Sequence, residues 1–203
     1  MSKIYLVRHG ETEWNKAQRT QGCSNNIPLS EEGIKQAKAL GERLKNKEID
    51  LFFSSELGRA YETANIIASY HNKKVEIVEA FKEINFGVWE GLQYKEIMEK
   101  YKEVYSIWHY EPHLAKIPGG EDILSLKERS MTKLIEILNN NKEKNILIVS
   151  HGITIKVMIC AMLGIDLANM HKIRQDNTSL NLFEYNDRGF SVIHLNDTCH
   201  IGL

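Results

Sequence analysis

Two histidines follow short apolar segments of the sequence, and a glycine comes after each of them. His9 follows residues 4–8 (IYLVR), and His151 follows residues 146–150 (ILIVS). Unbroken apolar runs rich in β-branched residues are typical of strands that are buried on both faces of a parallel sheet. Ligands of open α/β sheets bind at the carboxyl ends of the strands. We therefore expect His9 and His151 to lie at one ligand-binding edge.

The residues around these histidines favour a phosphate-like ligand. Gly10 and Gly152 would let backbone N–H groups approach a ligand closely, and a helix that begins after His151 would direct its positive end at an anion. Arg8 and Arg59 would add forked donors for phosphoryl oxygens. Two histidines and a carboxylate could also hold a metal ion, but arginine is a poor neighbour for a cation. We expect phosphoryl transfer without metal or cofactor, and a metal hydrolase is the alternative.

Five motifs, in order along the chain, resemble the histidine phosphatase (phosphoglycerate mutase-like) superfamily. The match extends over nearly the whole sequence, and its first motif is the most specific. The motifs are residues 6–15 (LVRHGETEWN), 54–64 (SSxxGRAxxTA), 83–91 (EIxFGxWEG), 118–121 (PGGE) and 149–152 (VSHG).

The resemblance implies catalytic roles for five side chains. His9 would be the nucleophile that becomes phosphohistidine, while Arg8, Arg59 and His151 would bind the phosphoryl group. A neutral imidazole is a competent nucleophile, and two adjacent guanidiniums should keep His9 neutral below its reference pKa of about 6.5. Glu83 would serve as general acid and then as general base.

A carboxyl group is needed because hydrolysis in two steps requires a proton for the leaving alkoxide and later a base for water. Glu79 and Glu90 compete with Glu83 on proximity alone, and only the resemblance selects Glu83. The expected substrate contacts beyond the catalytic side chains are Asn15, Gly10, Thr12, Gln21, Gly22 and Gly152. Trp89 and Trp108 are interpreted as core or loop anchors, and His109 as a surface residue.

The middle of the chain favours a phosphatase over a mutase. Cofactor-dependent mutases of the superfamily carry a longer middle segment with an arginine pair, whereas residues 91–118 contain four lysines and no arginine. We expect hydrolysis of a small phosphorylated metabolite. The alternatives are mutase-type phosphoryl transfer, an α-ribazole phosphatase and, less favoured because all the catalytic residue types are present, a non-catalytic module that binds a phosphorylated ligand.

Along the chain, predicted strands alternate with predicted helices around these residues. Strands are predicted at 4–7, 51–53, 75–78 and 146–149, with a hairpin of 179–185 and 190–195. Helices are predicted at 30–47, 57–70, 94–109, 123–138 and 153–163, and residues 79–91 are predicted as an ordered loop. The pattern indicates an α/β fold: a three-layer α/β/α sandwich whose mostly parallel sheet has an antiparallel edge strand. We expect one domain, residues 1–203, with 91–120 as a lid segment.

The composition of the chain argues against nucleic acid and membranes as binding partners. Lysine and arginine total 26 and aspartate and glutamate total 27, so no overall field would attract nucleic acid or an anionic membrane. Three cysteines form no C-x-x-C pair. The N-terminal segment has only four apolar residues in a row before a charge, too short for a signal-peptide core, and no apolar run approaches the length of a transmembrane helix. A cytoplasmic enzyme with a small-molecule phosphomonoester substrate is the resulting expectation, and a homodimer is left open.

Overall fold

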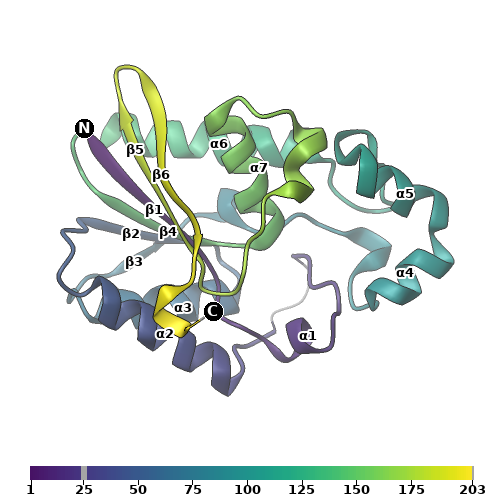
Figure 1. Cartoon of the computed structure of the whole chain (residues 1–203), viewed down its shortest axis with the longest axis horizontal. Coiled ribbons are helices and arrows are strands. Elements are labelled where there is room, and N and C mark those ends of the chain that lie inside the picture. Colours follow the sequence, from purple (N-terminus) through teal and green to yellow (C-terminus); the bar gives the residue numbers. More distant parts are fainter. Residues whose placement is uncertain (24–26, 203) are drawn as a thin grey trace.

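The computed structural model describes residues 1–23 and 27–202 and arranges them around one six-stranded mixed sheet (Figure 1). The strand order is β3-β2-β4-β1-β5-β6, in which β1, β4, β2 and β3 are parallel and β5 pairs antiparallel with both β1 and β6. The predicted α/β class and its antiparallel edge are confirmed. The strands are β1 (Ser2–Arg8), β2 (Leu51–Ser54), β3 (Val75–Ile77), β4 (Ile146–Ser150), β5 (Leu180–Asn186) and β6 (Gly189–Asp197).

Helices cover both faces of the sheet. Figure 1 shows α2 and α3 below it and α6 and α7 above it, whereas α4 and α5 lie beside it at the right. The helices are α1 (Glu13–Lys16), α2 (Glu31–Leu44), α3 (Gly58–Ser69), α4 (Tyr94–Lys100), α5 (Lys102–Tyr110), α6 (Ile123–Asn140) and α7 (Gly152–Leu163).

The sequence of strand β1 does not alternate between apolar and polar residues, because both faces of the strand are buried. Ile4 and Leu6 pack in the core cluster shared with α6 and α7, while Tyr5 and Val7 pack in the cluster shared with α2 and α3. Successive strand residues point to opposite faces, so a strand covered on both sides must be apolar throughout. The same holds for β4, whose five residues are all buried.

The helix ends follow local chemistry that the sequence makes visible. Ser30 precedes α2 and accepts a hydrogen bond from Gly33 N at 3.1 Å, as an N-cap should. Asp122 caps α6 in the same way through Ser125 N. Gly164 ends α7 with a φ of 66°, a left-handed conformation that glycine adopts without steric cost.

The predicted helix at 94–109 is wrong as a single element. Tyr101, with φ −126° and ψ 38°, leaves the helical region and separates α4 from α5. The break lets Ile97 and Trp108 both reach a third core cluster, together with Trp89. The predicted loop at 79–91 contains two short 3₁₀ turns, Glu79–Phe81 and Gly87–Trp89.

Across residues 1–23 and 27–202, the structure contains no helix that has both the length and the apolar character of a membrane span.

Candidate active site

His9 and His151 meet because their strands are neighbours. In the parallel pairing of β1 with β4, Arg8 lies opposite Ser150, and each histidine is the next residue along its strand. His9 N donates a hydrogen bond to Ser150 O at 3.0 Å. The two imidazole centroids are 5.1 Å apart, and both rings are buried. The backbone pairing of the sheet therefore sets the spacing of the two rings.

Arg59 joins them from the first turn of α3, which follows the neighbouring strand β2. Its side chain is 1% exposed, and its Nε donates to His9 Nε2 at 3.3 Å. Its Nη2 donates to Gly22 O at 2.8 Å. Gly22 has a φ of 55°, and a Cβ there would overlap the Glu90 carboxyl group, so a larger residue would displace the carbonyl that orients Arg59.

The two ring nitrogens of His9 have different partners. Nδ1 lies 2.7 Å from Gly10 O, and because a carbonyl oxygen only accepts, Nδ1 carries the proton. In the neutral ring Nε2 then presents its lone pair, and this is the atom that faces Arg59. Burial, and then the charges of Arg59 and Arg8, hold the pKa of His9 well below its usual value of 6.5. The guanidinium effect expected from sequence is present, but burial is the larger cause.

His151 is also held neutral and is fixed by a hydroxyl group. Its Nε2 lies 2.6 Å from Ser55 Oγ. Burial, followed by the charge of Arg59, lowers its pKa well below 6.5. His151 Nδ1 and Arg8 Nε are buried and have no hydrogen-bond partner among the residues that the structure describes. Buried polar atoms without partners are rare, and these two are suited to bind the oxygens of an anion.

Glu83 lies against the first turn of α7. Its Oε1 accepts hydrogen bonds from Thr154 N at 3.1 Å and Thr154 Oγ1 at 3.0 Å, and its Oε2 accepts from Ile153 N at 3.1 Å. The competing carboxylates are engaged elsewhere. Glu79 is paired with a lysine at the surface, and Glu90 accepts from Phe86 N.

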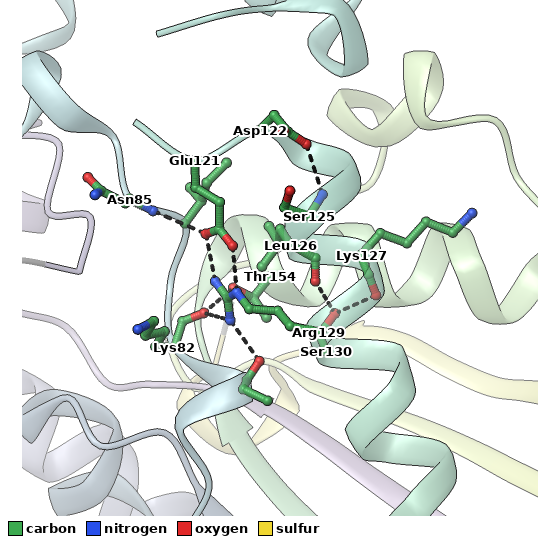
Figure 2. Close-up of polar contacts among 12 residues, drawn as sticks. Lys82, Asn85, Glu121, Asp122, Ser125, Leu126, Lys127, Arg129, Ser130 and Thr154 are labelled. Atoms are coloured by element: carbon green, nitrogen blue, oxygen red, sulfur yellow. Dashed lines mark hydrogen bonds and ion pairs between the residues drawn. The ribbon is translucent and has the colours of Figure 1, made fainter. Parts of the chain in front are cut away.

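Arg129 on α6 holds the backbone that carries Glu83. Its Nη1 donates to Ala80 O at 2.7 Å and Lys82 O at 3.0 Å, and its Nη2 donates to Glu83 O at 3.2 Å. The guanidinium also forms a two-point ion pair with Glu121, at 2.7 and 2.9 Å (Figure 2). We call Arg129 and Glu121, with the three carbonyl groups, the Arg129 brace.

A cavity of about 290 Å³ opens beside these groups. The segment that contains α4 and α5 supplies much of the opposite wall through Tyr94, Ile97, Tyr105, Trp108 and His109. His109 is exposed, as expected of a surface residue, yet it also lines the cavity. The sequence-predicted residues that line it are Arg8, His9, Asn15, Gln21, Gly22, Arg59, Glu83 and Gly152.

These groups line a cavity with arginines and a neutral imidazole, a set suited to an anion, and the comparison with known proteins agrees with that chemistry. The model of the histidine phosphatase superfamily (branch 1) matches residues 4–198. The chain belongs to the histidine phosphatase superfamily.

Relatives within the superfamily identify this member as a phosphatase. Phosphoserine phosphatase 1 of Hydrogenobacter thermophilus is 38% identical over 202 residues, which span 100% of this chain and 95% of the relative. A mutant phosphoserine phosphatase from Entamoeba histolytica, crystallised with phosphoserine, has a TM-score of 0.88 and 34% identity over 99% of this chain and 100% of that one. Bacillus stearothermophilus YhfR has a TM-score of 0.94 and 31% identity with the same coverage. The chain is a phosphatase with the phosphoglycerate mutase-like fold.

Two residues expected to contact substrate have other roles in this histidine phosphatase. The N–H of Gly10 donates to Thr63 Oγ1 at 3.0 Å, and a Cβ at Gly10 would lie 2.6 Å from Gly33 O, so close packing against α2 requires the glycine. Thr12 caps α1 and donates to Gln21 Oε1 at 3.0 Å. Gly10 and Thr12 do not line the cavity, and neither does His151, which was predicted to bind the phosphoryl group.

Sequence reasoning missed several side chains that shape the phosphatase site. Ser55 and Thr63 stand inside the second motif, but nothing in the motif indicates that one touches His151 and the other Gly10. Thr154 and Lys156 lie on α7, whose almost uniformly apolar sequence hides the direction of the cavity. Helical spacing from Gly152 could have indicated Lys156, because residues four apart share a face.

Proposed function

We propose that this phosphatase hydrolyses small phosphomonoesters in two steps and carries the phosphoryl group on His9 Nε2. The observation that carries the proposal is the tautomer of His9, because Gly10 O holds the proton on Nδ1 and leaves Nε2 as the unprotonated nitrogen, beside Arg59, of a residue that lines the cavity. Burial and two arginines keep the ring neutral. A neutral imidazole with a directed lone pair is a competent nucleophile.

In the first step, His9 Nε2 attacks phosphorus and the bond from phosphorus to the ester oxygen breaks. Arg8, Arg59 and His151 hold the phosphoryl oxygens, where catalysis depends mostly on positioning and charge stabilisation. The electron pair of the broken bond goes to the leaving oxygen, which takes a proton from the Glu83 carboxyl group. The products are an alcohol and phosphohistidine.

In the second step, Glu83 removes a proton from water while the water oxygen bonds to phosphorus. The N–P bond breaks, and its electron pair returns to His9 Nε2. Inorganic phosphate leaves, and Glu83 is again protonated for the next substrate. One carboxyl group serves both steps because its contacts with α7 keep it at the same edge of the cavity.

Phosphoserine is the substrate that we propose first. The support comes from two relatives named phosphoserine phosphatase, at 38% and 34% identity. A cavity of about 290 Å³ also suits a leaving group of a few heavy atoms. The four lysines of residues 91–118 do not line the cavity, so that segment supplies no cationic grip of the mutase kind within the described residues.

The proposal is tested by trapping the intermediate. The enzyme is incubated with phosphoserine and quenched, and phosphate on the protein is measured under acid and under base. We expect acid-labile, base-stable phosphate on the wild type, none on His9→Ala, and turnover that survives an excess of EDTA. His194→Gln, an exposed histidine on β6, is the matched control and should trap phosphate normally. Full turnover by His9→Ala, or complete loss of activity with EDTA, would refute the proposal.

A second assay separates hydrolysis from isomerisation. The enzyme is supplied with 3-phosphoglycerate and a catalytic amount of 2,3-bisphosphoglycerate, and both free phosphate and 2-phosphoglycerate are measured. We expect free phosphate to accumulate. Rapid formation of 2-phosphoglycerate would instead assign mutase chemistry to the same site.

A further inference from the structure

Lys156 places an ammonium group in the wall of the catalytic cavity. It stands on α7 three residues after Ile153 and four after Gly152, and all three residues line the cavity. That spacing puts them on one face of the helix. Within residues 1–23 and 27–202, Lys156 forms neither a hydrogen bond nor an ion pair with the protein.

The Lys156 side chain is expected to extend toward the end of the cavity where we propose that the phosphoryl group binds. Long side chains on a helix lean toward the helix N-terminus, which here is the turn that contacts Glu83. Lys156 interacts electrostatically with Arg8, Glu83 and Asp176. Burial, and then the charge of Arg8, lower the pKa of Lys156 from its usual value.

The other described residues that line the cavity are apolar, aromatic or polar and include arginines, but no second lysine. Phe86, Trp89, Ile97 and Trp108 present apolar surface to the cavity. Arg19 also lines it, but its Nη1 donates to a backbone carbonyl, Gly91 O, at 2.7 Å. His171 Nε2 pairs with Trp108 O, and burial lowers the pKa of this imidazole, so that it contributes little positive charge.

We propose that Lys156 binds a carboxylate on the leaving group, so that the enzyme selects phosphomonoesters of small hydroxy acids and hydroxy amino acids. The inference rests on the proposed function, because it takes the phosphoryl group to lie among His9, Arg8 and Arg59. With the phosphoryl group there, a carboxylate a few bonds away reaches the α7 wall. It meets there a lysine that forms no hydrogen bond or ion pair with any described residue, although the carboxylates of Glu83 and Asp176 interact with it electrostatically.

The test compares two substrates that differ by the carboxylate alone. Phosphoserine and phosphoethanolamine share the phosphate and the ammonium group, and only phosphoserine carries a carboxylate. We expect wild-type kcat/KM to favour phosphoserine by about 10- to 100-fold, the range for a hydrogen bond between charged groups. In Lys156→Met the ratio of the two kcat/KM values should fall close to one, mainly through a higher KM for phosphoserine, and Lys156→Arg should restore part of it.

The control is Lys133→Met, which removes a lysine from the surface of α6, where it pairs with Glu136, and should leave the ratio unchanged. A Lys156→Met enzyme that retains the wild-type preference, or loses both substrates equally, would overturn the inference. A wild type that hydrolyses both substrates equally would also overturn it, while leaving the phosphohistidine proposal standing.

A binding measurement keeps the inference testable if neither substrate turns over. In that event calorimetry on His9→Ala, with and without Lys156→Met, compares the affinities for phosphoserine and phosphoethanolamine. A preference for phosphoserine that depends on Lys156 supports the carboxylate subsite. Equal affinities refute it, independently of catalysis.

Discussion

The two ring nitrogens of His9 are distinguished by one short contact. Nδ1 is committed to Gly10 O, and the lone pair of Nε2 accepts a hydrogen bond from Arg59 Nε, a contact that must give way when Nε2 attacks phosphorus. Because burial is the largest cause of the lowered pKa, the neutral state of His9 is built into the apo protein and does not depend on substrate. The nucleophile is therefore prepared before the phosphate arrives.

At the scale of this residue we predict that His9 does not titrate across the usual histidine range. An NMR titration from about pH 7.5 to about pH 5.5, centred on the reference pKa of about 6.5, should leave the His9 ring signals in their neutral positions. Arg59→Met removes one cationic neighbour and should raise the pKa of His9 toward 6.5, so that titration becomes visible. The signals are assigned with His9→Asn. A wild-type midpoint near 6.5 would contradict the assigned electrostatics.

The sequence predicted a site residue well when the neighbouring residues in the chain fix its position. It predicted a site residue poorly when a distant element of the fold fixes its position. Arg8, His9 and Gly152 follow strand ends, and a buried strand is legible from its apolar run. The packing of Gly10 against α2 was not predicted, because α2 meets Gly10 only through the fold. Lys156 was missed because a helix that is apolar nearly all round gives no sign of which side adjoins a cavity.

At the scale of elements, the Arg129 brace connects α6 to the segment that presents Glu83. One guanidinium holds three carbonyl groups of residues 80–83, and Glu121 fixes that guanidinium from the end of the 118–121 motif. The 118–121 motif therefore has a structural role, the orientation of Arg129 by Glu121, which its sequence did not suggest. It also explains why an irregular segment can hold a catalytic carboxyl group in place.

We predict that Arg129→Leu lowers kcat more than it raises KM. The Glu83 backbone would lose its anchor, while the residues that contact phosphate would remain, so kcat should fall by roughly 10-fold or more, as small displacements of catalytic groups do. Stability should fall by about 2 kcal/mol because buried carbonyls lose their donors. Steady-state kinetics and urea unfolding measure both effects, and Lys133→Met on the same helix is the control. Arg129→Lys should recover part of kcat. A selective rise in KM would argue against a positioning role.

The helices themselves differed in how well their sequences predicted them. α2 and α6 have strong apolar periodicity and side-chain N-caps, whereas α7 is apolar nearly all round and ends at Gly164; all three were predicted within a few residues. The break at Tyr101 was not predictable, because no proline or glycine marks it. It arises from tertiary packing, which draws Ile97 and Trp108 into a common cluster.

On the scale of the whole molecule, several buried imidazoles couple stability to pH. The pKa values of His9 and His151 lie well below 6.5, and burial lowers that of His200 to about 4. In the unfolded chain these rings take up protons near pH 6.5, whereas in the folded chain they do so only at lower pH. Between those values the unfolded state binds more protons, so the free energy of unfolding decreases as pH falls below about 6.5.

We therefore predict that the urea midpoint is nearly constant above about pH 7 and falls between about pH 6.5 and pH 5. His200→Gln, which removes a ring bonded to Thr178 Oγ1 at 3.0 Å outside the cavity, should flatten that fall. The window lies above the range in which aspartates titrate, so histidines dominate it. A midpoint that does not change over this window would contradict the prediction.

The position of β4 in the sheet has a consequence for synthesis of the protein. Its five residues separate β2 from β1, although they come almost 100 residues after β2 in the chain. A growing polypeptide that has left the ribosome only as far as residue 145 already contains His9, Arg59 and Glu83, but the strand that brings β1 beside β2 does not yet exist. A nascent chain of that length cannot turn over phosphate esters, and the appearance of activity during translation would mark the moment at which the centre of the sheet closes.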